Sequence, residues 1–176
     1  MTRFVASVAR LVWIAVLSML FLLPLGWVQV APAHAKVQQI EEAPGQVVYQ
    51  SRQKLYDRNN HTWQAIAFKR IRPEGGDDLK LRLVGFPGSV ELAHPQPLAI
   101  ELPSGRVLLA EDISTEPFTD EAPASNVGQY NLQPVVEELP ERFQAVLVLP
   151  TENGGEVRLG ISLLVIQEWQ QLARQS

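Results

Sequence analysis

The chain has 176 residues, of which 15 are basic and 19 acidic, so its net charge is −4 with neutral histidine. It contains no cysteine, which excludes disulfides, zinc–thiolate sites, iron–sulfur clusters and thiol nucleophiles. An acidic surface also disfavours nucleic acid and anionic lipid as partners.

The N-terminal segment, residues 1–35, is predicted to be a secretory signal peptide. Two arginines precede an apolar run from Leu11 to Leu23, a helix break follows, and Ala33-His34-Ala35 supplies small residues for cleavage. The alternative is an uncleaved membrane anchor, because Leu11 to Val28 reaches the minimum of about 18 residues for a bilayer span. Cleavage would change the net charge from −4 to −6, since the segment carries two arginines and no acid.

The first half of the remaining chain predicts a three-stranded meander. Residues 36–46 are interpreted as a polar leader ending in a turn, so that one β-rich domain covers residues 47–176. An asparagine-rich turn follows an extended segment, and the return strand Thr62–Ile71 is apolar on both faces, which predicts a position inside a sheet. Leucines then alternate with Lys80 and Arg82, which is typical of a core strand with one buried face.

The second half predicts shorter strands and two helical segments. Glu111–Asn126 loses periodicity and is interpreted as a mobile acidic loop, and Gln133–Leu139 is expected to form two helical turns. Leu164–Arg174 has helical spacing and is expected to pack Trp169 and Leu172 onto a sheet. The predicted strands are Ser89–Ala93, Gln96–Leu102, Val107–Ala110, Val127–Leu132, Arg142–Leu149 and Val157–Leu163. The pattern favours a mainly β protein, an antiparallel β-sandwich or open barrel with a C-terminal helix.

The sequence indicates no catalytic residues, no metal site and no cofactor. After the signal segment, His61 and His94 are the histidines that remain, and neither belongs to a recognisable nucleophile motif. The acids between residues 111 and 121 lack the spacing of a calcium loop. A hydrolase with scattered carboxylates stays open as an alternative, because such groups need only meet in space.

A basic cluster supplies the candidate binding residues. It lies on two strands that are expected to pair, and it is either a solvated sheet face balanced by Asp77 and Asp78 or a docking surface for an acidic partner. Phe86, in the turn Gly85–Gly88, is a further candidate as an exposed aromatic tip. The cluster consists of Lys69, Arg70, Arg72, Lys80 and Arg82.

Four phrases together resemble a known family. They are EEAPGQVVYQSRQKLYDRNNHTWQAIAFKR (Glu41–Arg70), LRLVGFPGSVEL (Leu81–Leu92), NVGQYNLQPV (Asn126–Val135) and IQEWQ (Ile166–Gln170). The chain resembles a family of secreted cyanobacterial proteins described only as a domain of unknown function. The resemblance implies an exported protein of a photosynthetic bacterium, in the periplasm or the thylakoid lumen. The family carries no established activity or catalytic residues that could be mapped onto this chain.

The function expected from the sequence is that of an exported, non-enzymatic β-domain. In its concrete form it is an accessory or assembly protein that binds a protein complex at the photosynthetic membrane, without nucleic acid. The alternative is a β-sandwich that binds a small ligand or glycan. That alternative predicts an apolar pocket lined by Trp63, Tyr49, Phe86 or Tyr130.

Overall fold

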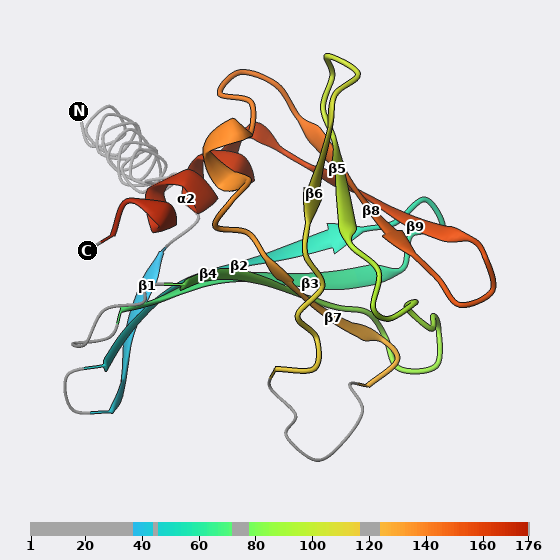
Figure 1. The fold of residues 1–176 in the computed structure, drawn as a ribbon, viewed down its shortest axis with the longest axis horizontal. Helices are drawn as coiled ribbons and strands as arrows, with labels where there is room; N and C mark the ends of the chain where they lie inside the picture. The colour runs from blue at the N-terminus through green and yellow to red at the C-terminus, as the bar shows by residue number, and fades with distance from the viewer. Residues whose placement is uncertain (1–36, 44–45, 72–77, 117–123, 176) are drawn as a thin grey trace, which may run out of the picture. The chain divides into compact units, whose positions relative to one another are not determined.

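The computed structural model describes residues 37–43, 46–71, 78–116 and 124–175. The chain divides into two compact units, Met1–His34 and Ala35–Ser176, and all described residues belong to the second. They form two antiparallel sheets, of order β1-β2-β3-β4-β7 and β6-β5-β8-β9, and a C-terminal helix (Figure 1). The strands are β1 (Gln38–Ala43), β2 (Gln46–Tyr56), β3 (Thr62–Ile71), β4 (Asp78–Val84), β5 (Leu98–Glu101), β6 (Val107–Ala110), β7 (Val127–Asn131), β8 (Ala145–Pro150) and β9 (Glu156–Ile161). The helices are the 3-10 turn η2 (Val136–Glu138) and α2 (Leu163–Ala173).

The five-stranded sheet is built around β3 and β4, which confirms the predicted meander. β3 pairs with β2 and β4, and β4 pairs with β3 and β7. The β2–β3 turn carries Asn60 at φ 63°, a left-handed conformation that asparagine tolerates. The Asp57 carboxylate closes this turn by accepting hydrogen bonds from the backbone N–H groups of Asn59 and His61, both at 2.8 Å. These contacts set the register that places Leu55 opposite Trp63.

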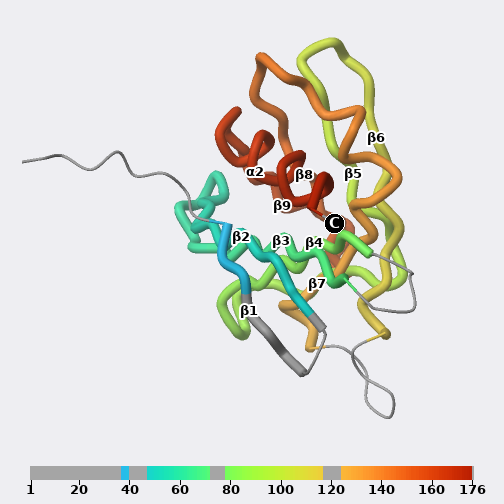
Figure 2. Tube along the Cα trace, turned by 90° about the vertical axis from the view of Figure 1, so that its left-hand side faces the viewer, coloured from blue at the N-terminus to red at the C-terminus, as the bar shows by residue number. Residues whose placement is uncertain are grey.

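The four-stranded sheet faces the inner side of the first sheet and completes a sandwich that is not closed into a barrel. Its strands β8 and β9, which correspond to the predicted strands Arg142–Leu149 and Val157–Leu163, form a hairpin with Gly154 at φ 78° in the turn. In Figure 2 the five strands of the first sheet lie in one layer, and β5, β6, β8, β9 and α2 lie on one side of it. Inward-facing leucines of both sheets are buried, as are the inward residues of α2.

Helix α2 packs on the inner side of β2 and β3, which confirms the predicted positions of Trp169 and Leu172. Both side chains are fully buried. Glu168, on the same helix, is also buried, and its carboxylate accepts hydrogen bonds from Ser51 Oγ and from Gln53 Nε2 of β2. A buried carboxylate needs such donors, since an unpaired charge inside a protein is strongly destabilising.

Three predictions about local structure were wrong. Residues 38–43, interpreted as part of a leader, form the edge strand β1, because an edge strand can pair through its backbone without an apolar alternation. The predicted strand Ser89–Ala93 is reduced to one bridge, between Leu92 and Thr151, after a tight turn at Phe86–Ser89. Gln133–Leu139 forms only η2, since Leu132–Val135, where the helix was expected to begin, form a turn.

The segment after β6 connects the two sheets. Asp112 forms a bridge with Tyr130, and the backbone N–H groups of Ile113 and Asn131 donate to the carbonyls of Gln129 and Glu111. This pairing covers the outer edge of β7. The described part of the predicted acidic loop therefore begins as an ordered extension of the sheet, and residues 117–123 lie outside the described residues.

Candidate functional site

The outer face of the five-stranded sheet, turned away from the other sheet, gathers cationic and apolar side chains. Strand alternation sends Trp63, Ala65 and Ala67 of β3 into the core, and it sends Ile66 and Phe68 outward. The register then aligns the outward residues in rows across the sheet. One row is Arg52, Ile66, Arg82 and Gln129, and the next is Gln50, Phe68, Lys80 and Asn131.

Arg82 is held within its row by hydrogen bonds and a ring contact. Its Nε and Nη2 atoms donate to Gln129 Oε1 at 3.0 and 2.7 Å, and its guanidinium carbon lies 5.7 Å from the centroid of the Phe68 ring. Burial lowers the pKa of Arg82, and the positive charges of Arg70 and Arg52 lower it further. The three guanidinium groups therefore repel one another across the centre of this face.

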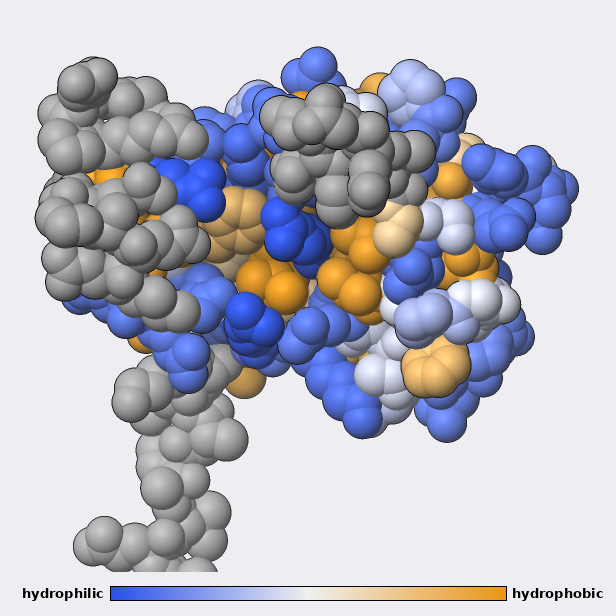
Figure 3. Space-filling view, turned by 90° about the horizontal axis from the view of Figure 1, so that it is seen from below, coloured by the Kyte–Doolittle hydropathy of each residue, from blue (hydrophilic) through white to orange (hydrophobic). Residues whose placement is uncertain are grey.

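A hollow of about 150 Å³ lies between these side chains. Figure 3 looks at the face from below and shows orange apolar residues at its centre with blue hydrophilic residues around and between them. We call this region the arginine hollow; it is lined by Val48, Gln50, Arg52, Ile66, Phe68, Arg70 and Arg82.

The structure separates the basic residues that the sequence grouped together. Arg70 and Arg82 lie on the outer face, but Lys69 points inward and is only 6% exposed. Its ammonium group donates to the carbonyls of Ala173 at 2.9 Å and Gln175 at 2.6 Å, at the C-terminal end of α2. Lys69 therefore fastens the helix to the sheet. Arg72 lies outside the described residues.

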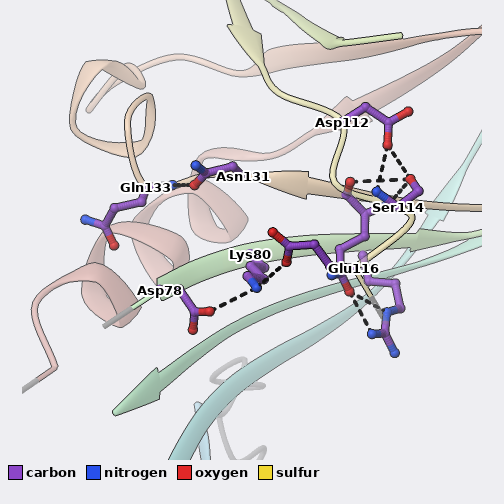
Figure 4. A network of polar contacts seen from close by, with 9 residues as sticks. Asp78, Lys80, Asp112, Ser114, Glu116, Asn131 and Gln133 are labelled. Atoms are coloured by element: carbon purple, nitrogen blue, oxygen red, sulfur yellow. Dashed lines mark hydrogen bonds and ion pairs between the residues drawn. The ribbon is translucent and has the colours of Figure 1, made fainter. Parts of the chain in front are cut away.

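Lys80 lies on the outer face, where two carboxylates neutralise its charge. Its Nζ atom is 2.9 Å from Asp78 Oδ2 and 2.6 Å from Glu116 Oε2. Figure 4 shows Lys80 between these two carboxylates. Burial lowers the pKa of Lys80, but these two partners outweigh burial and raise it. Lys80 thus helps to hold the segment after β6 against β4, and its neutralised charge adds little to that of the arginines on this face.

Phe86 stands apart from the arginine hollow on a tight turn. The Phe86 carbonyl accepts hydrogen bonds from the backbone N–H and the hydroxyl of Ser89, and Gly88 has φ 77°. Gly85 packs so closely on Trp63 that a Cβ there would lie 2.9 Å from the indole ring. The Phe86 side chain is 71% exposed at the end of this anchored turn.

Asp112 organises a polar cluster that contains His94, one of two histidines in the described part of the chain. Its carboxylate is 2.7 Å from His94 Nδ1 and accepts hydrogen bonds from the Ser114 backbone N–H, the Ser114 hydroxyl and the Gln96 N–H. Figure 4 shows the contacts to Ser114. Because Ser114 bonds to Asp112 and not to His94, the cluster lacks the nucleophile–base contact of a catalytic triad. It ties the approach to β5 to the segment that pairs with β7.

The aromatic residues expected to line a ligand pocket do not line one together. Trp63 and Tyr130 are buried in the core, and Tyr49 packs against it. Two further hollows, of about 270 and 300 Å³, open on the domain surface, and none of the four aromatic residues named in the ligand-binding alternative lines them. Their linings are mostly polar. Within the described residues, no three His, Asp or Glu side chains are placed to hold a metal ion.

Arg52 is the arginine of the hollow that sequence reasoning missed. The alternation of β2 is weak, with valines and tyrosines on both faces, so the outward side of the strand could not be assigned. The hairpin turn supplies the missing signal, because counting back from Asn59-Asn60 places Arg52 opposite Ile66.

Residues 35–172 match the family described as protein of unknown function (DUF3122). The chain belongs to this family. The match covers both sheets and nearly all of α2, so the arginine hollow and Phe86 are parts of the family domain. Neither any curated protein nor any solved structure matches the chain significantly. None of the helices in the described ranges is long and apolar enough to cross a membrane.

Proposed function

We propose that this chain is an exported, non-enzymatic binding domain that docks onto an acidic surface of a partner protein through the outer face of its five-stranded sheet. In its specific form, the partner is part of a protein complex at the photosynthetic membrane, and the domain resides in the periplasm or thylakoid lumen. The observation that carries the proposal is the arginine hollow, a cationic and apolar concentration on a protein with a net charge of −4.

The charge distribution supports a protein partner in preference to a membrane or nucleic acid. At physiological ionic strength, charges separated by more than about 8 Å are largely screened. A partner that touches only the outer sheet face therefore meets the arginines, whereas an extended anionic lipid surface or polynucleotide also meets the acidic remainder of the domain.

The composition of the face also suits a protein interface. Arginine and aromatic residues are enriched at the centres of such interfaces, where guanidinium groups bind carboxylates in a planar, two-point geometry. Ile66 and Phe68 supply apolar contact area between Arg52 and Arg82. Phe86 offers a second, separate contact on a hydrogen-bonded turn.

The proposal is tested by affinity purification of a C-terminally tagged chain from its native membranes, followed by mass spectrometry of the bait and of co-purified proteins. Three baits are compared: the natural chain, the double variant Arg52→Gln/Arg82→Gln, and the control Arg142→Gln. Arg142 is exposed next to β8, and its replacement removes a positive charge without touching the arginine hollow.

The expected result is a membrane complex that co-purifies with the natural chain and with Arg142→Gln, and at least about tenfold less with the double variant, which corresponds to about 1.4 kcal/mol. Recovery of the same complex by all three baits, or of nothing above background by the natural chain, would contradict the proposal. A bait that begins at Lys36 would identify the exported form, and one that retains residues 1–35 would identify a membrane-anchored domain.

A further inference from the structure

One cross-strand row places two arginine side chains on either side of a single residue of β3. Arg52 and Arg82 both lie directly opposite Ile66, on the strands that flank β3. Neighbouring strands are about 4.8 Å apart, so the two arginine backbones are separated by roughly 10 Å. Arginine side chains are long enough to converge from these positions above Ile66.

Each of these two arginine side chains keeps hydrogen-bond donors available for a ligand. Gln129 accepts from Nε and Nη2 of Arg82, and Gln50 accepts from Nε of Arg52 at 3.3 Å. Within the described residues, Nη1 of Arg82 and both Nη atoms of Arg52 have no hydrogen-bond partner. The two glutamine side chains are neutral, so they orient the guanidinium groups without cancelling their charge.

The size of the hollow decides what it can hold. A drug-sized ligand needs about 300–1,000 Å³, whereas a cavity of about 150 Å³ holds one benzene-sized group. At about 150 Å³, the arginine hollow therefore accommodates one side chain. Three of its lining residues, Val48, Ile66 and Phe68, are apolar, which favours a side chain with methylene groups below its charged end.

We propose that the arginine hollow receives a single glutamate side chain from an acidic segment of the partner protein. The Nη groups of Arg52 and Arg82 donate to its carboxylate, and its two methylene groups lie on Ile66 and Phe68. This inference rests on the proposed function and names the chemical group that the docking face recognises. The mutual repulsion of the guanidinium groups, which lowers the pKa of Arg82, is relieved when the carboxylate binds.

The test is an NMR titration of the ¹⁵N-labelled protein, which observes the arginine Nε–Hε resonances. The protein has the N-terminus that mass spectrometry finds on the bait from its native membranes. The probes are the blocked peptide acetyl-Glu-Leu-Glu-Leu-Glu-amide and its analogues with glutamine or aspartate in place of glutamate. Inorganic phosphate and vesicles containing anionic phospholipid serve as probes of other anion sources. The variants Arg52→Gln and Arg82→Gln assign the signals, and Arg142→Gln is the charge control.

The expected result is a saturable shift of the Arg52 and Arg82 resonances by the glutamate peptide. The aspartate in the hollow has one methylene group fewer than glutamate, which is worth about 0.8 kcal/mol. The aspartate analogue should therefore bind about fourfold more weakly. The glutamine analogue should bind at least about tenfold more weakly, because charge-assisted hydrogen bonds are lost. Either arginine variant should abolish the shift at the other arginine, and Arg142→Gln should not.

Several results would overturn the inference. They are equal binding of the glutamine analogue, phosphate shifts as large as the peptide shifts, recruitment to the vesicles, and no shift by any peptide. If the peptides fail while co-purification still depends on Arg52 and Arg82, glutamate recognition is wrong and the docking face stands. If neither peptide binding nor co-purification depends on Arg52 and Arg82, the proposed function fails as well.

Discussion

Replacement of Asp112 by asparagine tests the polar cluster that joins the two sheets. The Asp112 side chain is 4% exposed and accepts four hydrogen bonds, two of them from Ser114 and the others from Gln96 and His94. Asparagine keeps one oxygen for Ser114 but points an NH₂ group toward the Gln96 N–H. One donor is then left without an acceptor and the charge that strengthens the others is lost.

The magnitude follows from the contacts that change. Hydrogen bonds to a charged group contribute about 1.5–3 kcal/mol each, and a buried polar group left unsatisfied costs about 1–3 kcal/mol. We therefore expect Asp112→Asn to lower the free energy of unfolding by about 2–4 kcal/mol at pH 7. The exposed Glu137→Gln removes the same unit of charge and should change it by less than about 0.5 kcal/mol.

The effect of Asp112 should also depend on pH in a defined direction. Burial raises the pKa of Asp112, but hydrogen bonds from Ser114 and His94 outweigh burial and hold it below its ordinary value of 3.8. A carboxylate whose pKa is lower in the folded state stabilises the protein above the unfolded value, and this contribution is lost as the pH falls through the folded value. The difference between wild type and Asp112→Asn should thus be full at pH 7 and shrink below pH 3.8.

Urea unfolding followed by circular dichroism at pH 7, 5 and 3 measures this difference. The m-values should stay equal, since the variant changes neither the fold nor the surface exposed on unfolding. A difference below about 0.5 kcal/mol at pH 7 would refute the role assigned to the hydrogen bonds. A difference of the same size at pH 3 and pH 7 would refute the electrostatic part.

Three further predictions concern stability at pH 7, measured by urea unfolding. Lys69→Met should lower the free energy of unfolding by about 1–3 kcal/mol, because two carbonyls at the end of α2 lose their donor, and it should leave glutamate-peptide binding unchanged. Gly128→Ala should cost about 1–3 kcal/mol, since its Cβ would lie 2.8 Å from ring carbons of the buried Tyr130. Arg52→Gln/Arg82→Gln should change stability by less than about 1 kcal/mol, because the lost contacts to Gln129 and Phe68 are offset by relief of charge repulsion.

Local sequence patterns predicted the framework of this fold well. The period of two in Leu79–Leu83 and the turn residues around Asn60 are local signals, and they correctly gave the central strands and their hairpin. The spacing of Trp169 and Leu172 likewise identified the C-terminal helix. The edge strand β1 was missed because its pairing comes from backbone hydrogen bonds, which leave little trace in side-chain pattern.

The candidate site was harder to predict because it depends on register between distant strands. Lys69 and Arg70 are neighbours in sequence, and neighbours in a strand face opposite sides of a sheet. Since Trp63, Ala65 and Ala67 are apolar on one face, the same alternation already places Lys69 inward. What no local pattern supplies is the helix terminus that receives its ammonium group, 104 residues further along the chain.

The inward face of β3 contributes to folding, and we propose that its outward face contributes to recognition. The inward residues bury apolar area and, through Lys69, fix α2, so their replacement should cost stability without changing binding. The outward residues Ile66 and Phe68 sit between cations whose mutual repulsion does not favour folding. A structural role for Arg52 and Arg82 predicts that removing them destabilises the domain, whereas a recognition role predicts loss of binding with stability nearly unchanged. Measuring both quantities on the same double variant therefore separates the two explanations.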